Sequence, residues 1–427
     1  MVYYITYGRV RNVGFIATRL AGTDGVSLEA AKWADVFERE GLACFYFAGE
    51  LDRPPDRSYL VEEAYFRHPD ILDLNRRCFG TQRRKRYITQ KIHEIKRKLK
   101  EHLYKFIEKY RIDLLIPENS LALPLNIPLG IAITEVISET RMPAIAHHHD
   151  FFWERQEFKT SAVCEYINMA FPPPLPSIRH VVINSPANKE LALRTGISST
   201  IIPNVMDFEN PPHPLDYYAS DVRKALDIKD DELFILQPTR VVRRKGIEHA
   251  IELVRRLGMK AKLVISHASG DEGHDYEQRV IEYSKLMNVN TLFVSDIINE
   301  QRGYTKTGKK IYTLNDIYPH ADLVTYPSGY EGFGNAFLEA VYFRKPVVVN
   351  NYSIYSEDIK PKGFMVIEID GYVTEKAIDM TRLVLKDPNL RKNMVDQNYE
   401  IAKFYYSYSV LDQKLRNLMS DCMGGKF

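Results

Sequence analysis

An alternation of short apolar runs with longer helical stretches is the feature that most restricts the fold of this chain. Such a βαβ rhythm is typical of a parallel sheet with helices on both faces. A helix is expected over Ser27–Glu40, after the apolar run Val13–Ala17. The expected strands of the first half are Ala43–Ala48, Asp113–Pro117, Ala144–Ala146, His180–Asn184 and Thr200–Ile202.

The rhythm starts again after a proline-rich polar segment at 210–215, which we interpret as a linker. The chain has 427 residues, which suits two domains. We therefore predict an α/β protein with two Rossmann-like, doubly wound domains, residues 1–209 and 210–405. The expected strands of the second half are Phe234–Gln237, Lys262–Ser266, Thr291–Val294, Leu323–Tyr326 and Pro346–Asn350.

Composition excludes several classes of protein. The four cysteines form no C-x-x-C pair, so neither a disulfide framework nor a zinc site of that spacing is expected. The N-terminus lacks the pattern of a signal peptide, and no run of 18 uncharged apolar residues occurs. We expect a cytoplasmic protein, with attachment to a membrane surface left open. The net charge of +2 indicates no particular partner.

The segment Arg83–Lys105 is strongly basic, with ten Lys or Arg and two Glu. Its apolar residues recur at three- and four-residue steps, as in a helix with one apolar stripe. It is either a solvated helix packed on the N-terminal sheet or a basic patch for an anionic acceptor or an acidic membrane. No nucleic-acid partner is expected, because no aromatic interleaving or known binding motif accompanies it.

The most informative stretch runs from Tyr326 to Ala340. An expected strand ends at Tyr326, a glycine-containing loop follows, and a helix opens near Asn335. The free N–H groups and positive dipole end of such a helix suit a phosphate, and glycines allow close backbone approach. Glu331 lies on the loop and Glu339 near the helix start. Singly, each has an ordinary explanation as a solvated or dipole-stabilised acid; together with the glycines they indicate a ligand site.

This stretch resembles the E-x7-E signature of glycosyltransferase family 4, in its form PS-x-x-EGFG-x-x-x-LEA. The resemblance implies that Glu331 contacts hydroxyls of a donor sugar and that Glu339 binds the ribose. One departure is Arg344, where the family usually has glycine, which concerns the helix-to-strand turn more than the chemistry. The donor-binding backbone would comprise Gly332, Phe333, Gly334 and Asn335.

A second motif follows the strand Phe234–Gln237. The family places an Arg after this strand and a Lys-Gly five residues on, which correspond to Arg240 and Lys245. Their implied role is to hold the diphosphate, and fixed cations do stabilise a leaving group that gains negative charge. We expect Arg243 and Arg244 to point elsewhere. The turn that includes Ile297 is expected to contact the nucleotide base.

The loop Arg19–Glu29 carries glycines before a helix, which again gives an anion-friendly N-terminus. In the family this loop approaches the donor phosphate and the acceptor, so Gly25 is expected near both, and Arg19 and Asp24 on the acceptor side. The segment TDGVSLEA resembles the corresponding loop of a subgroup whose members build small sugar conjugates such as glycosylglycerates.

Three consecutive histidines precede Asp150. Adjacent residues on an extended chain alternate sides, so a shared metal would need ligands from elsewhere, and no other His or Cys cluster is visible. The family has a His-Asp step here, which implies that His149 lies near the donor sugar and that Asp150 orients it or touches the acceptor. Asn119 follows another strand; it either faces the acceptor or, like Ser120, caps a helix.

The resemblance implies the GT-B fold, with two facing Rossmann-like domains, the active site in the interdomain cleft, and a final helix, within 406–427, crossing back to the N-terminal domain. It implies a retaining hexosyltransferase that uses a UDP-, GDP- or ADP-sugar and a small polar acceptor, for example a phosphorylated glycerate or a sugar. His149, Arg240, Lys245 and Glu331 are the expected catalytic residues. No protein nucleophile, cofactor or metal is expected.

Three other functions stay open. A lipid-linked acceptor would suit the basic helix. A sugar phosphorylase or a nucleotide-sugar epimerase could use the same fold. A noncatalytic protein that binds nucleotide-sugars or tethers to membranes would bind without turnover, although the paired glutamates and the Arg/Lys pair argue against it.

Overall fold

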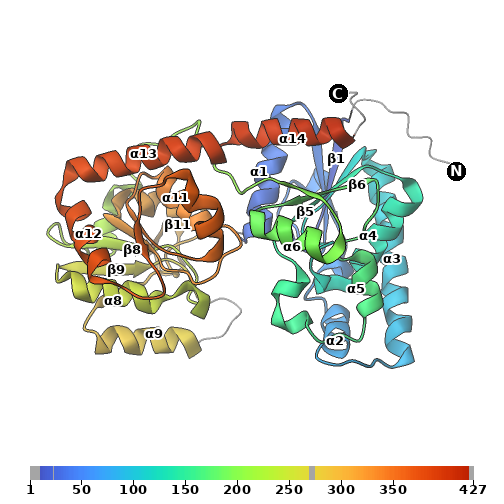
Figure 1. Cartoon of the computed structure of the whole chain (residues 1–427), viewed down its shortest axis with the longest axis horizontal. Helices are drawn as coiled ribbons and strands as arrows, with labels where there is room; N and C mark the ends of the chain where they lie inside the picture. Colours follow the sequence, from blue (N-terminus) through green and yellow to red (C-terminus); the bar gives the residue numbers. More distant parts are fainter. Residues whose placement is uncertain (1–9, 23, 269–274, 423–427) are drawn as a thin grey trace. The chain divides into compact units, whose positions relative to one another are not determined.

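A computed structural model of the chain describes residues 10–22, 24–268 and 275–422. It divides into two compact units (Figure 1). The N-terminal unit comprises Met1–Asn204 and Tyr408–Phe427, and the C-terminal unit comprises Val205–Ser407. The boundaries predicted from sequence, after residue 209 and after residue 405, lie a few residues from these.

The N-terminal unit is built on a seven-stranded parallel sheet of order β3-β2-β1-β4-β5-β6-β7. Its strands are β1 (Asn12–Ile16), β2 (Ala43–Ala48), β3 (Ser58–Leu60), β4 (Leu114–Pro117), β5 (Ala144–His148), β6 (Ile178–Val182) and β7 (Ser199–Ile201). Its helices are α1 (Gly25–Arg39), α2 (Pro69–Cys78), α3 (Arg86–Tyr110), α4 (Ile127–Thr140), α5 (Cys164–Ala170), α6 (Ser185–Thr195) and α14 (Tyr408–Cys422).

Helix α3 forms where the basic segment predicted one. Its apolar stripe is buried in the core with α4, the outcome expected of a helix packed against its own domain. Several of its cations are paired: Lys96 and Lys100 both contact Glu135 of α4, at 2.9 and 2.8 Å. The stripe consists of Ile88, Ile92, Ile95, Leu99, Leu103 and Phe106.

The C-terminal unit has a six-stranded parallel sheet of order β10-β9-β8-β13-β14-β15. Its strands are β8 (Leu233–Gln237), β9 (Ala261–Ile265), β10 (Asn290–Phe293), β13 (Leu323–Tyr326), β14 (Val347–Asn350) and β15 (Ile367–Ile369), with a hairpin of β11 (Gly303–Tyr304) and β12 (Lys310–Ile311). Its helices are α7 (Val222–Ala225), α8 (Ile247–Leu257), α9 (Asp275–Leu286), α10 (Leu314–Ile317), α11 (Asn335–Tyr342), α12 (Glu375–Lys386) and α13 (Pro388–Tyr406).

The two-sheet α/β architecture predicted from sequence is confirmed, with corrections at single strands. The strand expected at His180–Asn184 is β6, which begins and ends two residues earlier, because Asn184 instead caps α6 by accepting a hydrogen bond from Ala187 N at 2.8 Å. The short strands β3 and β15, which lie at sheet edges, were not predicted.

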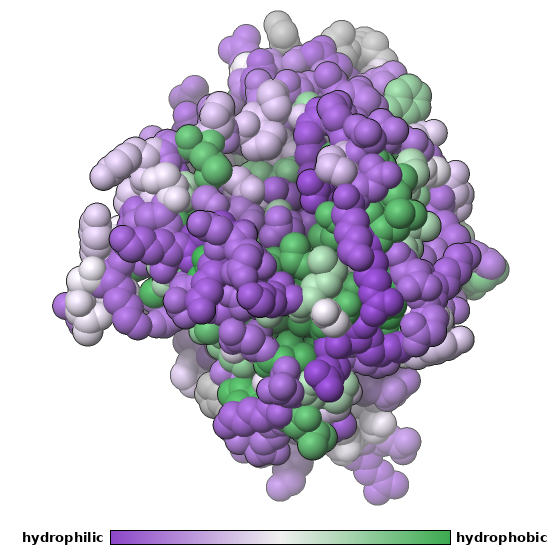
Figure 2. Space-filling view, turned by 90° about the vertical axis from the view of Figure 1, so that its left-hand side faces the viewer, coloured by the Kyte–Doolittle hydropathy of each residue, from purple (hydrophilic) through white to green (hydrophobic). Residues whose placement is uncertain are grey.

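Figure 2 shows the molecule from the side where α8, α9 and α12 lie; this surface is mostly hydrophilic, with apolar residues gathered near its centre. Charged residues make up 27% of the chain, so a polar exterior over apolar sheets is the expected arrangement. Among the described residues, each helix is either too short or too polar to traverse a bilayer.

Strand order determines where a ligand can bind in each unit. In open parallel sheets, ligands bind outside the carboxyl ends of the strands, at the point where the strand order reverses. That point lies between β1 and β4 in the N-terminal unit and between β8 and β13 in the C-terminal unit. The loops after these four strands hold most of the residues singled out from sequence.

Candidate active site

An ion pair joins the two sequence motifs of the C-terminal unit. Lys245 ends a short 3-10 turn after β8, and Glu331 lies on the loop after β13. The Lys245 ammonium donates a hydrogen bond to Oε1 of Glu331, and each residue exposes only 8% of its surface. The adjacent strands β8 and β13 therefore bring together residues 86 positions apart.

Arg244 contacts the same carboxylate. Its Nη1 donates to Oε2 of Glu331 at 3.1 Å and to the carbonyl oxygen of Tyr330 at 3.3 Å. The prediction that Arg244 points elsewhere is therefore wrong, because the 3-10 turn rotates this side chain toward the β13 loop. Arg243, in the same turn, is exposed as expected.

Opposing effects act on the charges of this pair. Burial lowers the pKa of Lys245, and the charge of Glu331 opposes that shift. Burial also disfavours the charged form of Glu331, but the charges of Lys245 and Arg244 outweigh it and lower its pKa. Glu331 is thus held as a carboxylate between two cations, which keeps a polar ligand site organised before any ligand arrives.

Arg240 extends the cluster of positive charge. Its side chain is exposed at the carboxyl end of β8. Burial, together with the charges of Arg240 and Lys245, lowers the pKa of His267 to about 4. The carboxyl end of β8 thus carries several cations close together, an arrangement that could bind an anionic ligand.

Two glycines let the backbone of this region pack closely. Gly246 has φ +58°, and a Cβ there would lie 2.5 Å from the carbonyl oxygen of Pro327. Gly334 caps α11 with φ +131°, and a Cβ there would lie 2.5 Å from the hydroxyl of Tyr352. That hydroxyl donates to the carbonyl oxygen of Phe333 at 2.8 Å, so the loop conformation depends on Gly334.

The remaining residues that were expected to bind the donor lie in the loop and the helix that the motif predicted. Asn335 is the first residue of α11, and Gly332, Phe333 and Gly334 form the loop before it. Glu339 lies one turn into the helix and accepts a hydrogen bond from the Tyr318 hydroxyl at 2.8 Å. Ile297 lies in a turn, and its carbonyl oxygen accepts a hydrogen bond from Tyr312 N at 2.8 Å.

The contacts of Arg344 account for an arginine at a position where the family usually has glycine. It has φ +51°, in the left-handed region where glycine is usual. Its guanidinium stacks over the ring of Tyr399 at 3.8 Å and pairs with Asp396 at 2.6 Å. These contacts hold an arginine in a conformation that the family usually assigns to glycine.

In the N-terminal unit, Asp24 is the N-cap of α1. Its Oδ1 accepts from the backbone N–H of Val26 and Ser27 at 3.1 and 3.2 Å, and Gly25 is the first helical residue. Its Oδ2 accepts from Arg19 Nη2 at 2.9 Å. Two of the residues expected on the acceptor side, Arg19 and Asp24, therefore contact each other.

Asn119 connects the ends of β4 and β5. It adopts φ +54°, donates to Asp150 Oδ1 at 2.8 Å and accepts from His149 N at 3.0 Å. The alternative that Asn119 or Ser120 caps a helix is wrong: Asn126 caps α4 instead. Asp150 also accepts from Arg155 Nε at 2.7 Å.

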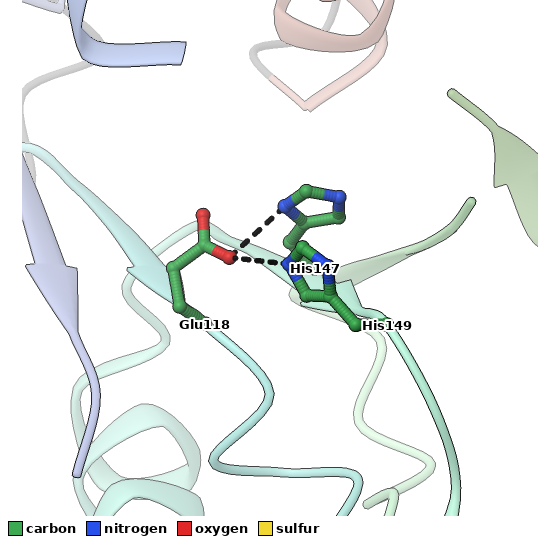
Figure 3. Close-up of side chains that lie close together, drawn as sticks. All are labelled: Glu118, His147 and His149. Carbon is green, nitrogen blue, oxygen red and sulfur yellow. Dashed lines mark hydrogen bonds and ion pairs between the residues drawn. The ribbon is translucent and has the colours of Figure 1, made fainter. Parts of the chain in front are cut away.

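His149 lies beside a carboxylate that the sequence analysis did not pair with it. Its Nε2 lies 3.2 Å from Oε2 of Glu118, and His147 Nδ1 lies 3.0 Å from the same oxygen (Figure 3). His148 points to the other side of β5, where its Nε2 lies 2.9 Å from Nδ1 of His180. The alternation expected of an extended chain is confirmed, and it leaves His147 and His149 on one side.

Comparison with known proteins decides the family. Residues 219–401 match the family described as "Glycosyl transferases group 1". A mannosylglucosylglycerate synthase of Thermotoga maritima is 32% identical, over 92% of this chain and 96% of the relative. The chain belongs to the group 1 glycosyltransferases. A second mannosylglucosylglycerate synthase, from Petrotoga mobilis, is 31% identical over 84% of this chain and 86% of its own length.

The fold of this glycosyltransferase agrees with that assignment. A crystal structure of a glycosyltransferase from Rickettsia africae ESF-5 superposes with a TM-score of 0.68 at 12% identity, covering 97% of this chain and 99% of that one. The predicted GT-B fold, the family resemblance and the class of enzyme, a hexosyltransferase, are thereby confirmed.

Two residues of this glycosyltransferase were missed by the analysis of its sequence. Arg244 was expected, like Arg243, to lie on a solvated face. Glu118 was not singled out, because only His and Cys side chains were considered as metal ligands. Its position directly after a buried strand, like that of His149 after β5, was the available signal, since both strands end at one edge of the sheet.

Proposed function

We propose that this enzyme transfers a hexosyl group, with retention of configuration, from a nucleotide-diphosphate sugar to a glycosylated glycerate. The relatives' names describe a product composed of mannose, glucose and glycerate. A mannosyl donor and a glucosylglycerate acceptor are therefore the first pair to test. The TDGVSLEA loop, which resembles makers of such conjugates, supports the same acceptor class.

The observation that carries the proposal is the cluster at the β8 and β13 ends. Lys245 and Arg240 would bind the diphosphate, whose charge grows as the anomeric C–O bond breaks. Glu331 would accept hydrogen bonds from donor sugar hydroxyls, and Glu339 from the ribose. The diphosphate would then compete with Glu331 for the Lys245 ammonium, because Lys245 and Glu331 form an ion pair.

The transfer we propose needs no protein nucleophile and no metal at the diphosphate. The bond from the anomeric carbon to the diphosphate oxygen breaks, and one to an acceptor hydroxyl oxygen forms on the same face. The acceptor proton passes to the leaving diphosphate. His149 would orient the sugar, and Arg19, Asp24, Asn119 and Asp150 would contact the acceptor.

A donor-by-acceptor panel tests the proposal. Full-length enzyme is incubated with GDP-mannose, UDP-glucose or ADP-glucose and with glucosylglycerate, its 3-phosphate, glycerate or lipid vesicles. Nucleotide release and NMR of the product anomeric proton are measured. We expect one nucleotide class to give an α-linked product from glucosylglycerate, and the reaction to be lost in Glu331→Gln.

Other outcomes would replace the proposal with a specific alternative. Turnover only with vesicles would favour a lipid-linked acceptor. A donor sugar altered without any acceptor would indicate an epimerase, and release of a sugar 1-phosphate from a glycoside and inorganic phosphate would indicate a phosphorylase. Donor binding without turnover across the panel would favour a noncatalytic binding protein.

A further inference from the structure

The ends of β4 and β5 bring three potential metal ligands together in the N-terminal unit. Glu118 directly follows β4, His147 lies in β5, and His149 follows it (Figure 3). One ligand atom from each residue lies within 4.8 Å of the others. We propose that Glu118, His147 and His149 bind a divalent transition-metal ion such as Zn²⁺.

Burial leaves polar atoms of this cluster without partners. Among the described residues, no hydrogen bond reaches Oε1 of Glu118 or either ring nitrogen of His147. Nδ1 of His147 lies 3.0 Å from Glu118 Oε2, but the two groups are not aligned for a hydrogen bond. Glu118 and His147 are each 1% exposed, so bulk water does not satisfy them. Buried polar atoms of this kind usually indicate a bound ion or water.

The ligand set suits a particular class of ion. Two imidazoles and one carboxylate are typical of Zn²⁺, Fe²⁺ and related ions, not of Mg²⁺ or Ca²⁺, which prefer oxygen. Ligand atoms about 2.1 Å from a shared ion lie about 3.0–3.4 Å apart at tetrahedral to octahedral angles. The distances from Glu118 Oε2 to the two histidine nitrogens, 3.0 and 3.2 Å, agree with that spacing.

Neighbouring side chains support the cluster. A second buried acid, Glu29, is already paired with Lys32. The ring of Trp33 stacks on His147 with centroids 4.2 Å apart, which holds the imidazole in place.

A bound ion would hold His149 for its proposed role. Nε2 of His149 faces Glu118, so Nδ1 is the ring nitrogen left for a sugar hydroxyl. The ion would join the β4 and β5 loops, which Asn119 already connects through its contacts with His149 and Asp150. Metal binding itself does not depend on the enzyme's substrates, so the test below stands apart from the activity assay.

Metal binding is measured on the tag-free, full-length enzyme after removal of metal with EDTA and of EDTA by dialysis. Zn²⁺ binding is followed by calorimetry, and Co²⁺ binding by its visible absorption. The variants are Glu118→Gln, which is nearly isosteric, and His149→Gln, at the less buried ligand. His180→Gln is the matched control, because it removes a buried imidazole of β6 that contacts His148 and lies apart from the cluster.

We expect one Co²⁺ or Zn²⁺ per chain in the unsubstituted enzyme and in His180→Gln. Affinity should fall at least about tenfold in Glu118→Gln and His149→Gln, which corresponds to about 1.4 kcal/mol. Zn²⁺ at a hundredfold excess over its Kd should raise Tm by about 5–10 °C in the unsubstituted enzyme and in His180→Gln. The same Zn²⁺ concentration should raise Tm by less in Glu118→Gln and His149→Gln.

Two results would overturn the proposal. One is the absence of binding by folded, unsubstituted enzyme, which would leave Glu118 as a hydrogen-bond partner of His149 with a water beside His147. The other is equal binding by Glu118→Gln, His149→Gln and the unsubstituted enzyme, which would assign the ion to surface histidines. Circular dichroism in EDTA confirms that each variant is folded before its affinity is compared.

Discussion

The Lys245 ammonium is buried against the Glu331 carboxylate, and Arg244 contacts the other oxygen of that carboxylate. Removing the two ends of this pair should therefore have unequal effects on stability. Glu331→Gln leaves two cations facing each other and should cost about 3–5 kcal/mol of unfolding free energy. Lys245→Met should cost less, because Arg244 still compensates Glu331. Urea unfolding of the two variants checks this order.

The double variant tests whether the two residues act as one unit. Residues in contact couple by about 0.5–3 kcal/mol, so Lys245→Met should cost less in the Glu331→Gln background than alone. Transfer should fall about 10²- to 10³-fold in each single variant. Additive stability effects would contradict the pair as a functional unit.

Arg240 should matter for transfer and not for folding. Its side chain is exposed, so Arg240→Ala should leave Tm unchanged. Loss of one charge-assisted contact to the diphosphate, about 1.5–3 kcal/mol, should lower kcat/KM about 10- to 150-fold. Arg243→Ala is the matched control, since Arg243 is exposed in the adjacent turn. Equal losses in both variants would indicate a diffuse effect of charge.

Asp24 has a capping role that can be separated from acceptor binding. Asp24→Ala should cost about 0.5–2 kcal/mol of stability, and Asp24→Ser should restore most of it, because serine also caps helices. Serine cannot keep the ion pair with Arg19. If kcat/KM for the acceptor falls in both variants while stability recovers only in the serine variant, Asp24 contacts the acceptor. Recovery of both quantities would assign it the cap alone.

Gly334 should not tolerate a side chain. Gly334→Ala would place a Cβ 2.5 Å from the Tyr352 hydroxyl at φ +131°, and should cost about 1–3 kcal/mol. Displacing Tyr352 would break its bond to Phe333, so transfer should fall as well. Gly303→Ala, where a Cβ meets nothing within 4 Å, should change stability by about 0.5 kcal/mol at most. Thermal melts and nucleotide release compare the two.

Stability should depend on pH through Lys345. Burial lowers the pKa of this lysine from 10.5 to about 8, although its ammonium donates to the Pro319 carbonyl oxygen at 2.7 Å. Between pH 8 and 10.5 the unfolded chain therefore holds a proton that the folded chain releases, so stability rises with pH in this window. The unfolding free energy of the unsubstituted enzyme should rise, relative to that of Lys345→Met, as pH rises from 8 to 10. The two values should therefore converge or cross. A difference independent of pH would exclude this assignment.

Much of the C-terminal site could be predicted because its signals are local. The end of a strand, a glycine loop and the start of a helix occupy the short segment from Tyr326 to Glu339. Apolar runs indicate the strand and the helix, and the glycines indicate the loop. The same holds for Arg240 and Lys245, which both lie within eight residues of the end of β8. Elements of this kind depend on neighbouring residues, which sequence displays directly.

The sequence by itself determined two α/β units, the family and the positions of two motifs in the C-terminal unit, because periodicity and glycine placement are properties of adjacent residues. Only the tertiary structure decided which side chains meet. Arg244 reaches Glu331, and Glu118 reaches His147 and His149, across 87 and about 30 positions of chain. These contacts arise because neighbouring parallel strands end at one edge of a sheet, and strand order is a property of packing that no local pattern encodes.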